Sequence, residues 1–443
     1  MPDHVNIVKL ADNYCMAELG PQNEYLSLVA HSQYFKRTSS AVVPDEGVRQ
    51  MTLHIMEKLY SDIRVDTSGW FTHDNFLTVL YLLDFTSSPG IPYLYQRTTI
   101  GEWLGYNGLT FDDSKVDLLW RHVLALHDNP IEFDLVIWRF FQKMEPTKLT
   151  KKAVNRWRLI AAPPLHVQVL WQMAFARQNN LEIKNSYKLP TQQGIIIPFG
   201  GWKDYYRQWQ NNKLTCSTDM TAWDWTVPGW LLDMDLELRT RLTDKDPSWI
   251  SATKSLYNNA FHNCKLAISD GRVFKQLFPG IMKSGCVNTI STNGHMQIML
   301  HLIVAIENNT SLSIPRVVGD DKICNNEHLD LTSEYEKYGP IIKSITENLE
   351  FVGQEWRADG PLPMYLGKHV TKLLYQVDAF LPETLDALLR YYAYSPYRFF
   401  LRDLASQLNI NVKSDEFYLF WMDNPLAREI FHKEIDVYNK TLE

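Results

Sequence analysis

The stretch Val317-Val318-Gly319-Asp320-Asp321-Lys322-Ile323-Cys324 decides how this chain is interpreted. Its apolar flanks predict two short strands, and Gly319 predicts a tight hairpin turn, because glycine tolerates the positive φ that such a turn requires. The turn would present Asp320 and Asp321 together. Two adjacent carboxylates repel each other unless cations neutralise them, and hard oxygen ligands favour Mg²⁺ or Mn²⁺. Taken alone, the triplet is equally compatible with a surface turn, so the rest of the chain has to decide.

The composition is that of a large folded protein. At 443 residues, ordinary domain sizes predict about three units or one multi-lobed enzyme, and a hydrophobic content of 45% excludes general disorder. The longest apolar run, Met299 to Ile306, is far shorter than the roughly 20 residues of a transmembrane helix, so no transmembrane segment is predicted. The start carries no visible secretory signal. Five scattered cysteines without a Cys-x-x-Cys pair argue against disulfides and zinc and favour a reducing compartment.

A basic segment stands out against the formal net charge of −7. Six basic residues and one acid lie between Lys143 and Arg158, the densest cationic stretch of the chain. Arg156 and Arg158 alternate with Trp157 in a strand-like pattern that would place both guanidinium groups on one face. Forked guanidinium groups suit phosphate oxygens, although a solvated charged face is the more common fate of such a run.

A second acidic pattern lies in residues 214–227. The first half of this stretch is β-prone, which places Asp219 at the end of a strand and Asp224 five residues later, beyond a bend. Pro228 suits the first position of a helix over residues 229–242, since its missing N–H costs nothing there. A strand and a turn that each deliver one carboxylate can form a metal site, but two unrelated surface acids would give the same pattern.

A third pattern opens a helix that we expect to run to about residue 308. Ser284 and Gly285 form a flexible loop, and Thr289 and Asn293 are four residues apart, so they share one helical face near the N-terminus. Such small hydrogen-bonding groups can recognise a hydroxyl or a phosphate, but Ser and Thr are also ordinary helix caps.

Residues 86–93 predict a rigid exposed loop. The sequence Thr-Ser-Ser-Pro-Gly-Ile-Pro-Tyr combines two prolines and a glycine with small hydroxyl side chains, which is typical turn chemistry. In isolation a plain connector is the more common explanation of such a sequence.

Taken together, the patterns resemble a known family. Asp-x₄-Asp from Asp219, Ser-Gly-x₃-Thr-x₃-Asn from Ser284 and Gly-Asp-Asp from Gly319 resemble, in order and spacing, motifs A, B and C of the palm of viral RNA-dependent RNA polymerases. Lys143-x-Glu-Pro, followed by residues 156–160, resembles motif F in the form found in sobemoviruses and poleroviruses. Residues 86–93 are similar to motif G, residues 335–347 to motif D and residues 349–355 to motif E. The chain is therefore identified as similar to the sobemo-like group.

The resemblance implies an α+β fold, the closed right-hand polymerase. The fingers would comprise residues 1–160, with motif F at 143–160. A palm with an antiparallel sheet and fingers insertions would comprise residues 161–352, and a helical thumb residues 353–443. Within the palm, motif A would occupy residues 214–227, motif B 283–308 and motif C 315–325.

The resemblance also implies roles for individual residues. Nucleotidyl transfer needs a nucleophilic 3′-hydroxyl and a stabilised leaving pyrophosphate, which two metal ions about 3.5 to 4 Å apart can serve. Asp219, Asp320 and Asp321 would be catalytic and hold two Mg²⁺ ions, or Mn²⁺, and Lys343 would protonate the pyrophosphate. The residues expected to bind the nucleoside triphosphate are Lys143, Arg156, Arg158, Asp224, Ser284, Thr289 and Asn293. Among these, Asp224, Ser284 and Asn293 would recognise the ribose 2′-hydroxyl. The residues expected along the template are Thr86, Ser87, Ser88, Gly90, Pro92 and Gly285.

The implied activity is template-directed RNA synthesis that replicates a positive-strand RNA virus genome. Its partners would be a single-stranded RNA template and the nascent RNA, with no DNA. The resemblance further suggests a genome-linked protein primer and viral replication proteins as partners. The expected location is the host cell cytoplasm, at membrane-associated replication complexes reached through other proteins.

One departure and three alternatives accompany this interpretation. The group commonly has Ser-Gly before the Trp-Asp pair of motif A, where this chain has Thr221-Ala222. A reverse transcriptase would share the palm, but it usually has an apolar or aromatic residue at the position of Gly319 and a bulky residue guarding the 2′ position. A metal-dependent nuclease would use clustered acids without the Ser-Gly-x₃-Thr-x₃-Asn element. An RNA-packaging or scaffold protein would use the basic segment without the acids.

Overall fold

The computed structural model describes residues 9, 11–326 and 331–430. Its central sheet has four antiparallel strands in the order β10-β5-β9-β8. The strands are β5 (Cys216–Thr221), β8 (Arg316–Val318), β9 (Asp321–Cys324) and β10 (Ile341–Thr346). The antiparallel sheet expected for the palm is therefore present, and it brings together strands that lie more than a hundred residues apart in the sequence.

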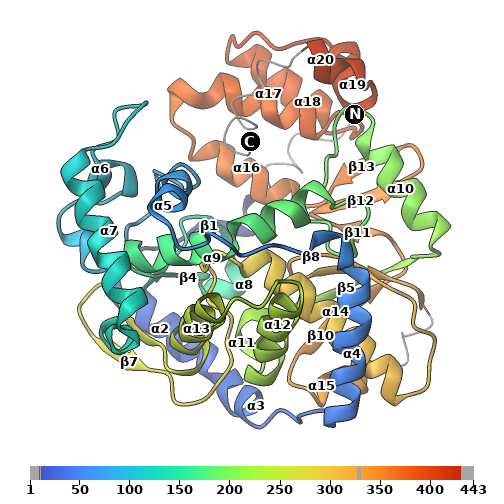
Figure 1. The fold of residues 1–443 in the computed structure, drawn as a ribbon. Coiled ribbons are helices and arrows are strands. Elements are labelled where there is room, and N and C mark those ends of the chain that lie inside the picture. Colours follow the sequence, from blue (N-terminus) through green and yellow to red (C-terminus); the bar gives the residue numbers. More distant parts are fainter. Residues whose placement is uncertain (1–8, 10, 327–330, 431–443) are drawn as a thin grey trace.

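Helices pack against this sheet and against one another. They are α4 (Glu46–Leu59), α12 (Gly229–Arg241), α14 (Thr289–Glu307) and α15 (Thr332–Glu336). Helix α14 contacts β8, α4, α12 and α15, and every residue from Ser291 to Ala305 in it is buried. Helix α4 belongs to the N-terminal segment yet packs on α12 and α14, so part of residues 1–160, which were expected to form the fingers, packs on the helices beside the central sheet (Figure 1).

A second body combines segments from both sides of Asp219 in the sequence. Its four-stranded sheet has the order β4-β2-β6-β7, with β2 (Trp138–Gln142), β4 (Leu159–Ala162), β6 (Lys265–Ala267) and β7 (Val273–Lys275). Strand β6 pairs in parallel with β2, so an insertion that follows Asp224 in the sequence completes a sheet begun near residue 138. The helices of this body are α2 (Pro21–His31), α3 (Phe35–Ser39), α5 (His73–Leu80), α6 (Ile100–Leu104), α7 (Asp113–Asp128), α9 (Leu165–Lys184) and α13 (Pro247–Tyr257).

The C-terminal part begins with strands, which corrects one expected boundary. A helical thumb was expected from residue 353, but β11 (Glu350–Phe351), β12 (Gln354–Arg357) and β13 (Gly360–Pro363) form a three-stranded antiparallel sheet, and the helices start only at Leu366. Gly353 and Gly360 take positive φ and allow the two tight turns. The helices that follow are α16 (Leu366–Leu374), α17 (Leu381–Tyr391), α18 (Arg398–Gln407), α19 (Asp415–Asp423) and α20 (Leu426–Ile430).

The N-terminal and C-terminal parts are joined by direct contacts. Strand β1 (Tyr14–Met16) pairs with β3 (Pro146–Lys148), and α16 contacts both strands. Lys368 on α16 also reaches Glu145, with its Nζ 3.5 Å from Oε2. These contacts tie the basic segment to the C-terminal helices, as the closed arrangement requires. No helix in the described part of the chain is long and apolar enough to span a membrane.

Candidate active site

The hairpin between β8 and β9 forms as its sequence predicts. Val318 pairs with Asp321, and Gly319 has a φ of 61°, in the left-handed region that favours glycine. A Cβ at Gly319 would meet nothing within 4 Å, so the backbone conformation rather than a lack of space selects glycine. Gln297 on α14 donates from Nε2 to the backbone oxygen of Asp320 at 2.9 Å. The acidic turn is therefore fixed to the buried helix beneath it.

The sheet brings Asp219 beside this turn. Strand β5 pairs with β9 up to Thr218 and Lys322, so the next residues along the two strands are Asp219 and Asp321. Asp320 and Asp321 are exposed residues, although protein atoms crowd around each carboxylate and partly bury it. This burial, with the charges of Asp224 and Asp321, raises the pKa of Asp320 to about 7. Burial and the charge of Asp219 raise the pKa of Asp321 to about 6. The acids therefore repel one another, as expected of a site made for cations.

Lys343 lies at the same site because of an irregularity in the sheet. Ser344 pairs with Asp219, and the register of β10 shifts between Ile342 and Ser344, so Lys343 occupies a bulge. A bulge re-aims the side chain that it contains, and here the ammonium group forms an ion pair with the carboxylate of Asp219. Both side chains are more than half exposed. Lys343 therefore occupies a position from which a cation bound to Asp219 would displace it.

Within the described part of the chain, no three acidic, histidine or cysteine side chains converge into a complete metal cage. The residues nevertheless fit a divalent cation that takes its remaining ligands from water and substrate phosphates, as Mg²⁺ usually does. The fit rests on Asp219, Asp320 and Asp321, which supply hard oxygen atoms, and on the mutual repulsion that a cation would relieve.

The three residues expected to recognise a ribose contact one another. Asp224 lies on the short helix α11 (Trp223–Thr226) and accepts hydrogen bonds from the Ser284 hydroxyl and from Asn293 Nδ2, the latter at 3.1 Å. Burial raises the pKa of Asp224 despite these hydrogen bonds. Since each carboxylate oxygen has two lone pairs, Asp224 can still accept from a sugar hydroxyl.

The loop before α14 is held by close backbone packing. Gly285 has a φ of 126°, and a Cβ there would lie 2.4 Å from the backbone oxygen of Ala161. Ala161 N in turn donates to Ser284 O at 2.8 Å, which fixes the loop to β4. Thr289, expected to contact the nucleotide, uses its hydroxyl to donate to Cys286 O at 2.7 Å. This hydrogen bond closes the loop that carries Ser284, and the contact of Thr289 with the nucleotide stays a prediction.

The basic segment differs from the expected strand. Strand β4 begins only at Leu159, so Arg156 and Arg158 do not share a strand face. Arg156 lies over the Tyr34 ring, with its guanidinium carbon 5.5 Å from the ring centre, whereas Arg158 Nη1 lies 3.7 Å from Glu145 Oε1. Trp157 between them is buried, and residues 156–158 belong to no strand.

Glu145 organises the cations near the acids, a role that the sequence did not reveal. Its carboxylate lies 3.7 Å from Lys143 Nζ, 3.7 Å from Arg158 Nη1 and 3.5 Å from Lys368 Nζ. The charge of Arg158 partly offsets the rise in the pKa of Asp224 and of Asp320, so Arg158 lies near these acids. One carboxylate thus arranges three cations, and Lys368 comes from a helix with no recognisable motif.

The loop at residues 86–93 is held by its own contacts and by α9. Asp84 Oδ1 accepts from the hydroxyl of Thr86 at 2.7 Å and Oδ2 from that of Ser87 at 2.6 Å, while Arg139 Nη1 donates to Ser88 Oγ at 3.4 Å. A Cβ at Gly90 would lie 2.4 Å from Pro163 O, so the loop, which continues through Pro92, packs on the segment that leads into α9. These contacts make the loop rigid, while its role at the template stays a prediction.

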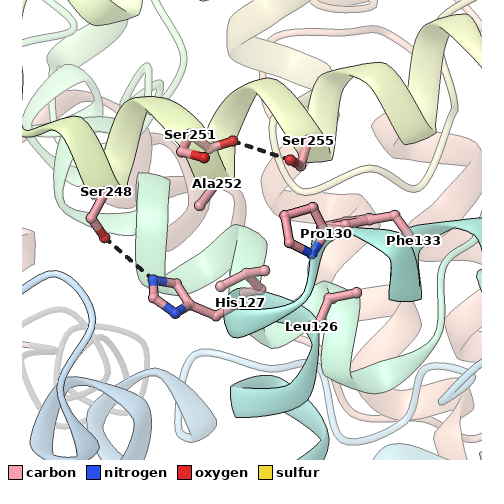
Figure 2. Close-up of a pocket in the computed structure, with 9 residues that line it drawn as sticks. Leu126, His127, Pro130, Phe133, Ser248, Ser251, Ala252 and Ser255 are labelled. Atoms are coloured by element: carbon pink, nitrogen blue, oxygen red, sulfur yellow. Dashed lines mark hydrogen bonds between the residues drawn. The ribbon is translucent and has the colours of Figure 1, made fainter.

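Two hollows of this structure lie away from Asp219, Asp320 and Asp321. Figure 2 shows one of about 130 Å³ between the end of α7, the turn η4 (Pro130–Leu135) and α13, where His127 Nε2 lies 3.3 Å from Ser248 Oγ. It has a single imidazole and no carboxylate in its lining. A wider groove of about 670 Å³ between α16 and α17 is mainly apolar. Neither contains the paired acids, so the candidate active site remains the sheet and turn that carry Asp219, Asp320 and Asp321.

The fold and the site together define a right-hand polymerase. The chain resembles the solved structure of "Sicinivirus 3Dpol RNA dependent RNA polymerase" with a TM-score of 0.69 and 14% identity over 87% of each chain. A family model described as viral RNA-dependent RNA polymerase matches residues 23–350. The chain therefore belongs to the viral RNA-dependent RNA polymerase family.

Similar proteins come from the viruses that the motifs suggested. "Protein P1-P2" of Turnip yellows virus is 26% identical over 427 residues, which cover 84% of this chain and 38% of that protein. "Replicase polyprotein P2AB" of Southern bean mosaic virus is 27% identical over 255 residues, covering 56% of this chain and 25% of that protein. "RNA-directed RNA polymerase" of Mushroom bacilliform virus is 28% identical over 203 residues, covering 41% of this chain and 48% of that protein. The predicted polerovirus and sobemovirus resemblance is confirmed, and the chain spans 38% of the length of the Turnip yellows virus protein.

Proposed function

We propose that this chain synthesises RNA on an RNA template by transferring nucleotides from nucleoside triphosphates to a 3′-hydroxyl, and so replicates a positive-strand RNA virus genome. The observation that carries the proposal is the juxtaposition of two groups. The repelling acids Asp219, Asp320 and Asp321 suit cations, and the hydrogen-bonded cluster of Asp224, Ser284 and Asn293 suits a ribose hydroxyl. A nuclease needs the first group only.

Asp219 and Asp320 would hold two Mg²⁺ ions, with Asp321 in support, and Mn²⁺ suits the same oxygen atoms. When bound, the ions supply the Lewis acidity that activates the 3′-hydroxyl and stabilises the leaving pyrophosphate. Lys143 and Arg158, arranged by Glu145, would neutralise the incoming triphosphate. Lys343, once released from Asp219, would be placed to donate a proton to the pyrophosphate.

The polymerase activity is tested with the purified chain, a defined RNA template, and reactions with and without a primer. Mg²⁺-dependent products of template length are expected, and Asp320→Ala should lower their yield about a thousandfold, since it removes a ligand to the ions. Asp270→Ala is the matched control, because Asp270 is an acid in the exposed turn between β6 and β7 and pairs with Arg272. Full activity of the Asp320 variant would refute the assignment.

Sugar selection is tested by the preference for ribonucleotides over deoxyribonucleotides. Asp224→Ala should reduce the ratio of kcat/KM for the two substrates about 10- to 100-fold, the size of one lost hydrogen bond to a charged group. Template affinity should change little. An unchanged ratio would remove Asp224 from this role.

The partners and location follow from the same proposal. We propose a single-stranded RNA template and nascent RNA as ligands, with no DNA, and a genome-linked protein primer and viral replication proteins as further partners. The proposed place of action is the host cytoplasm, at membrane-associated complexes reached through those proteins. Products that begin without added primer would argue against an obligatory protein primer, and sedimentation of the chain alone with cell membranes would argue against recruitment by other proteins.

A further inference from the structure

One buried side chain next to the ribose-recognition cluster has no role in the proposed chemistry. Trp223 directly precedes Asp224, and its side chain is only 2% exposed. Its indole Nε1 donates a hydrogen bond to Asn293 Oδ1 at 3.0 Å. Asn293 is itself 4% exposed, so water has little opportunity to replace this donor.

The amide of Asn293 is therefore held from both ends. Its oxygen accepts from Trp223 and its nitrogen donates to Asp224 Oδ1 at 3.1 Å. An indole can only donate and an ionised carboxylate can only accept, so both neighbours demand the same amide orientation. The nitrogen carries a second N–H, for which no other described residue supplies an acceptor. This N–H is the group available to a hydroxyl of a bound sugar.

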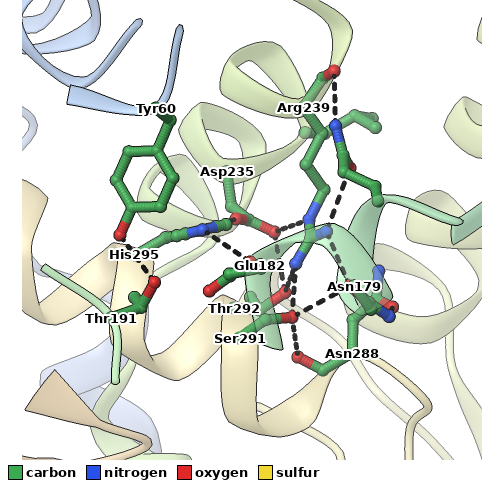
Figure 3. Close-up of polar contacts among 12 residues, drawn as sticks. Tyr60, Asn179, Glu182, Thr191, Asp235, Arg239, Asn288, Ser291, Thr292 and His295 are labelled. Atoms are coloured by element: carbon green, nitrogen blue, oxygen red, sulfur yellow. Dashed lines mark hydrogen bonds and ion pairs between the residues drawn. The ribbon is translucent and has the colours of Figure 1, made fainter. Parts of the chain in front are cut away.

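The backbone beneath Asn293 is fixed separately, by the charged network shown in Figure 3. Arg239 Nη2 donates to Ser291 Oγ at 2.6 Å, and Thr292 Oγ1 donates to Asp235 Oδ2 at 2.7 Å. His295 Nδ1 lies 2.6 Å from Asp235 Oδ1. The residues before and after Asn293 are thus anchored on other faces of α14. What remains free to vary is the side-chain torsion of Asn293, and that is what Trp223 constrains.

We propose that Trp223 is a positioning residue for ribose selection, which it serves by holding the Asn293 amide with its NH₂ group toward Asp224 and the sugar. This inference rests on the proposed function. Without the indole N–H, Asn293 would populate other orientations, and those that turn its oxygen toward the sugar would lose a donor to the 2′-hydroxyl. Deoxyribonucleotides make no such contact, so their incorporation would be affected less.

The test is Trp223→Phe, measured as kcat/KM for a ribonucleotide and for the matching deoxyribonucleotide in primer extension. The ratio of the two should fall about fivefold, the size of one net hydrogen bond. In an Asn293→Ala background the same substitution should change the ratio no further, because the amide it positions is absent. Equal losses for both substrates, or an unchanged ratio, would overturn the proposal.

The chain contains a matched control. Trp138 on β2 is fully buried, and its Nε1 donates to Asn259 Oδ1 at 2.9 Å, the same kind of bond in the body built on the β4-β2-β6-β7 sheet. Trp138→Phe should leave the ratio unchanged, whatever it does to stability. A similar fall of the ratio in this control would mean that Trp223→Phe acts through general loosening, and would overturn the proposal.

Loss of ring volume could unfold the Phe variant, so a second replacement keeps the test decisive. Installing 3-benzothienylalanine at position 223 retains the bicyclic ring and replaces the N–H with sulfur. It should give the same fall in the ratio with little loss of stability, and an unchanged ratio would again overturn the proposal.

If the wild-type chain incorporates no nucleotide, the proposed function fails and this inference fails with it. If it incorporates nucleotides and the ratio is unaffected, only the role of Trp223 fails.

Discussion

Two groups of charged side chains lie near helix α14 and differ in how their charges are balanced. In the exposed group, the pKa values of Asp320 and Asp321 are raised, and Asp219 pairs with the exposed Lys343. The buried group, shown in Figure 3, pairs every charge within the protein. Its members are Glu182, Asp235, Arg239 and His295, all buried.

The electrostatics of the two groups follow from their partners. Burial alone would raise the pKa of Asp235, but Arg239 and His295 hold it well below the usual range. Burial opposes a charge on His295, yet Glu182 and Asp235 raise its pKa to about 9. Among the exposed acids, Asp219 pairs with one exposed lysine, while the charges of neighbouring acids help to raise the pKa values of Asp320 and Asp321. The buried group therefore maintains the structure around α14, whereas the charge of the exposed group is left for a ligand to neutralise.

The strongest test of this contrast compares the stability of two aspartate variants. Asp235→Ala should lower the free energy of unfolding by about 3 to 5 kcal/mol, because Arg239 would remain buried without its carboxylate. Asp320→Ala should leave the stability of the metal-free protein unchanged or slightly higher, since it removes repulsion. Chemical denaturation of both variants and of Asp270→Ala measures the difference. Equal destabilisation by the Asp235 and Asp320 variants would contradict the contrast.

The pH dependence of stability gives a second, smaller effect. The pKa of His295 is raised from its ordinary value of 6.5 to about 9, so its contribution is complete below about pH 6.5 and is lost as pH rises through about 9. The melting temperature of the wild-type protein should therefore fall as the pH rises from 7 to 10. His295→Gln should be less stable at pH 7 and show a flatter profile over this range. Parallel profiles would exclude His295 as the titrating group.

Lys343 occupies one ligand of the exposed group through its ion pair with Asp219. Because it pairs with Asp219, it should compete with a metal ion, and an exposed pair of this kind is worth at most about 1 kcal/mol. Lys343→Met should therefore lower the concentration of Mg²⁺ that half-saturates binding, by up to about fivefold, as measured by titration calorimetry. Lys203→Met, which breaks the exposed pair between Lys203 and Asp423, should have no such effect. A higher Mg²⁺ requirement in the Lys343 variant would contradict the competition.

The smallest expected effect concerns the turn that leads to Asp224. Ala222 has a φ of 47°, in the left-handed region, at the position where the sobemo-like group commonly has glycine. Ala222→Gly should relieve this strain and stabilise the protein by up to about 1 kcal/mol. Ala252→Gly, in the middle of α13, should instead destabilise it by a similar amount. Destabilisation by Ala222→Gly would show that the turn is not strained.

Turns and helix ends were predicted well where the neighbouring residues alone determine the backbone conformation. Gly319 formed the expected turn, and the helix from Thr289 ends at Glu307, near the expected residue 308. The α+β fold and the family are confirmed as well, because ordered motifs carry them. The roles of the individual site residues stay predictions. The strand expected around Arg156 was wrong, because β4 begins only at Leu159 and the positive φ of Asn155 interrupts extended backbone just before Arg156.

The sequence by itself therefore determined which chemical groups the site contains and the short elements that carry them. Only the tertiary structure decided how they are oriented. Glu145 meets Lys368 across 223 residues, and Trp223 meets Asn293 across 70. The bulge that brings Lys343 to Asp219 depends on the register between two strands far apart in the chain. Local propensity cannot encode such contacts, because they arise only when packing of the core fixes one element against another.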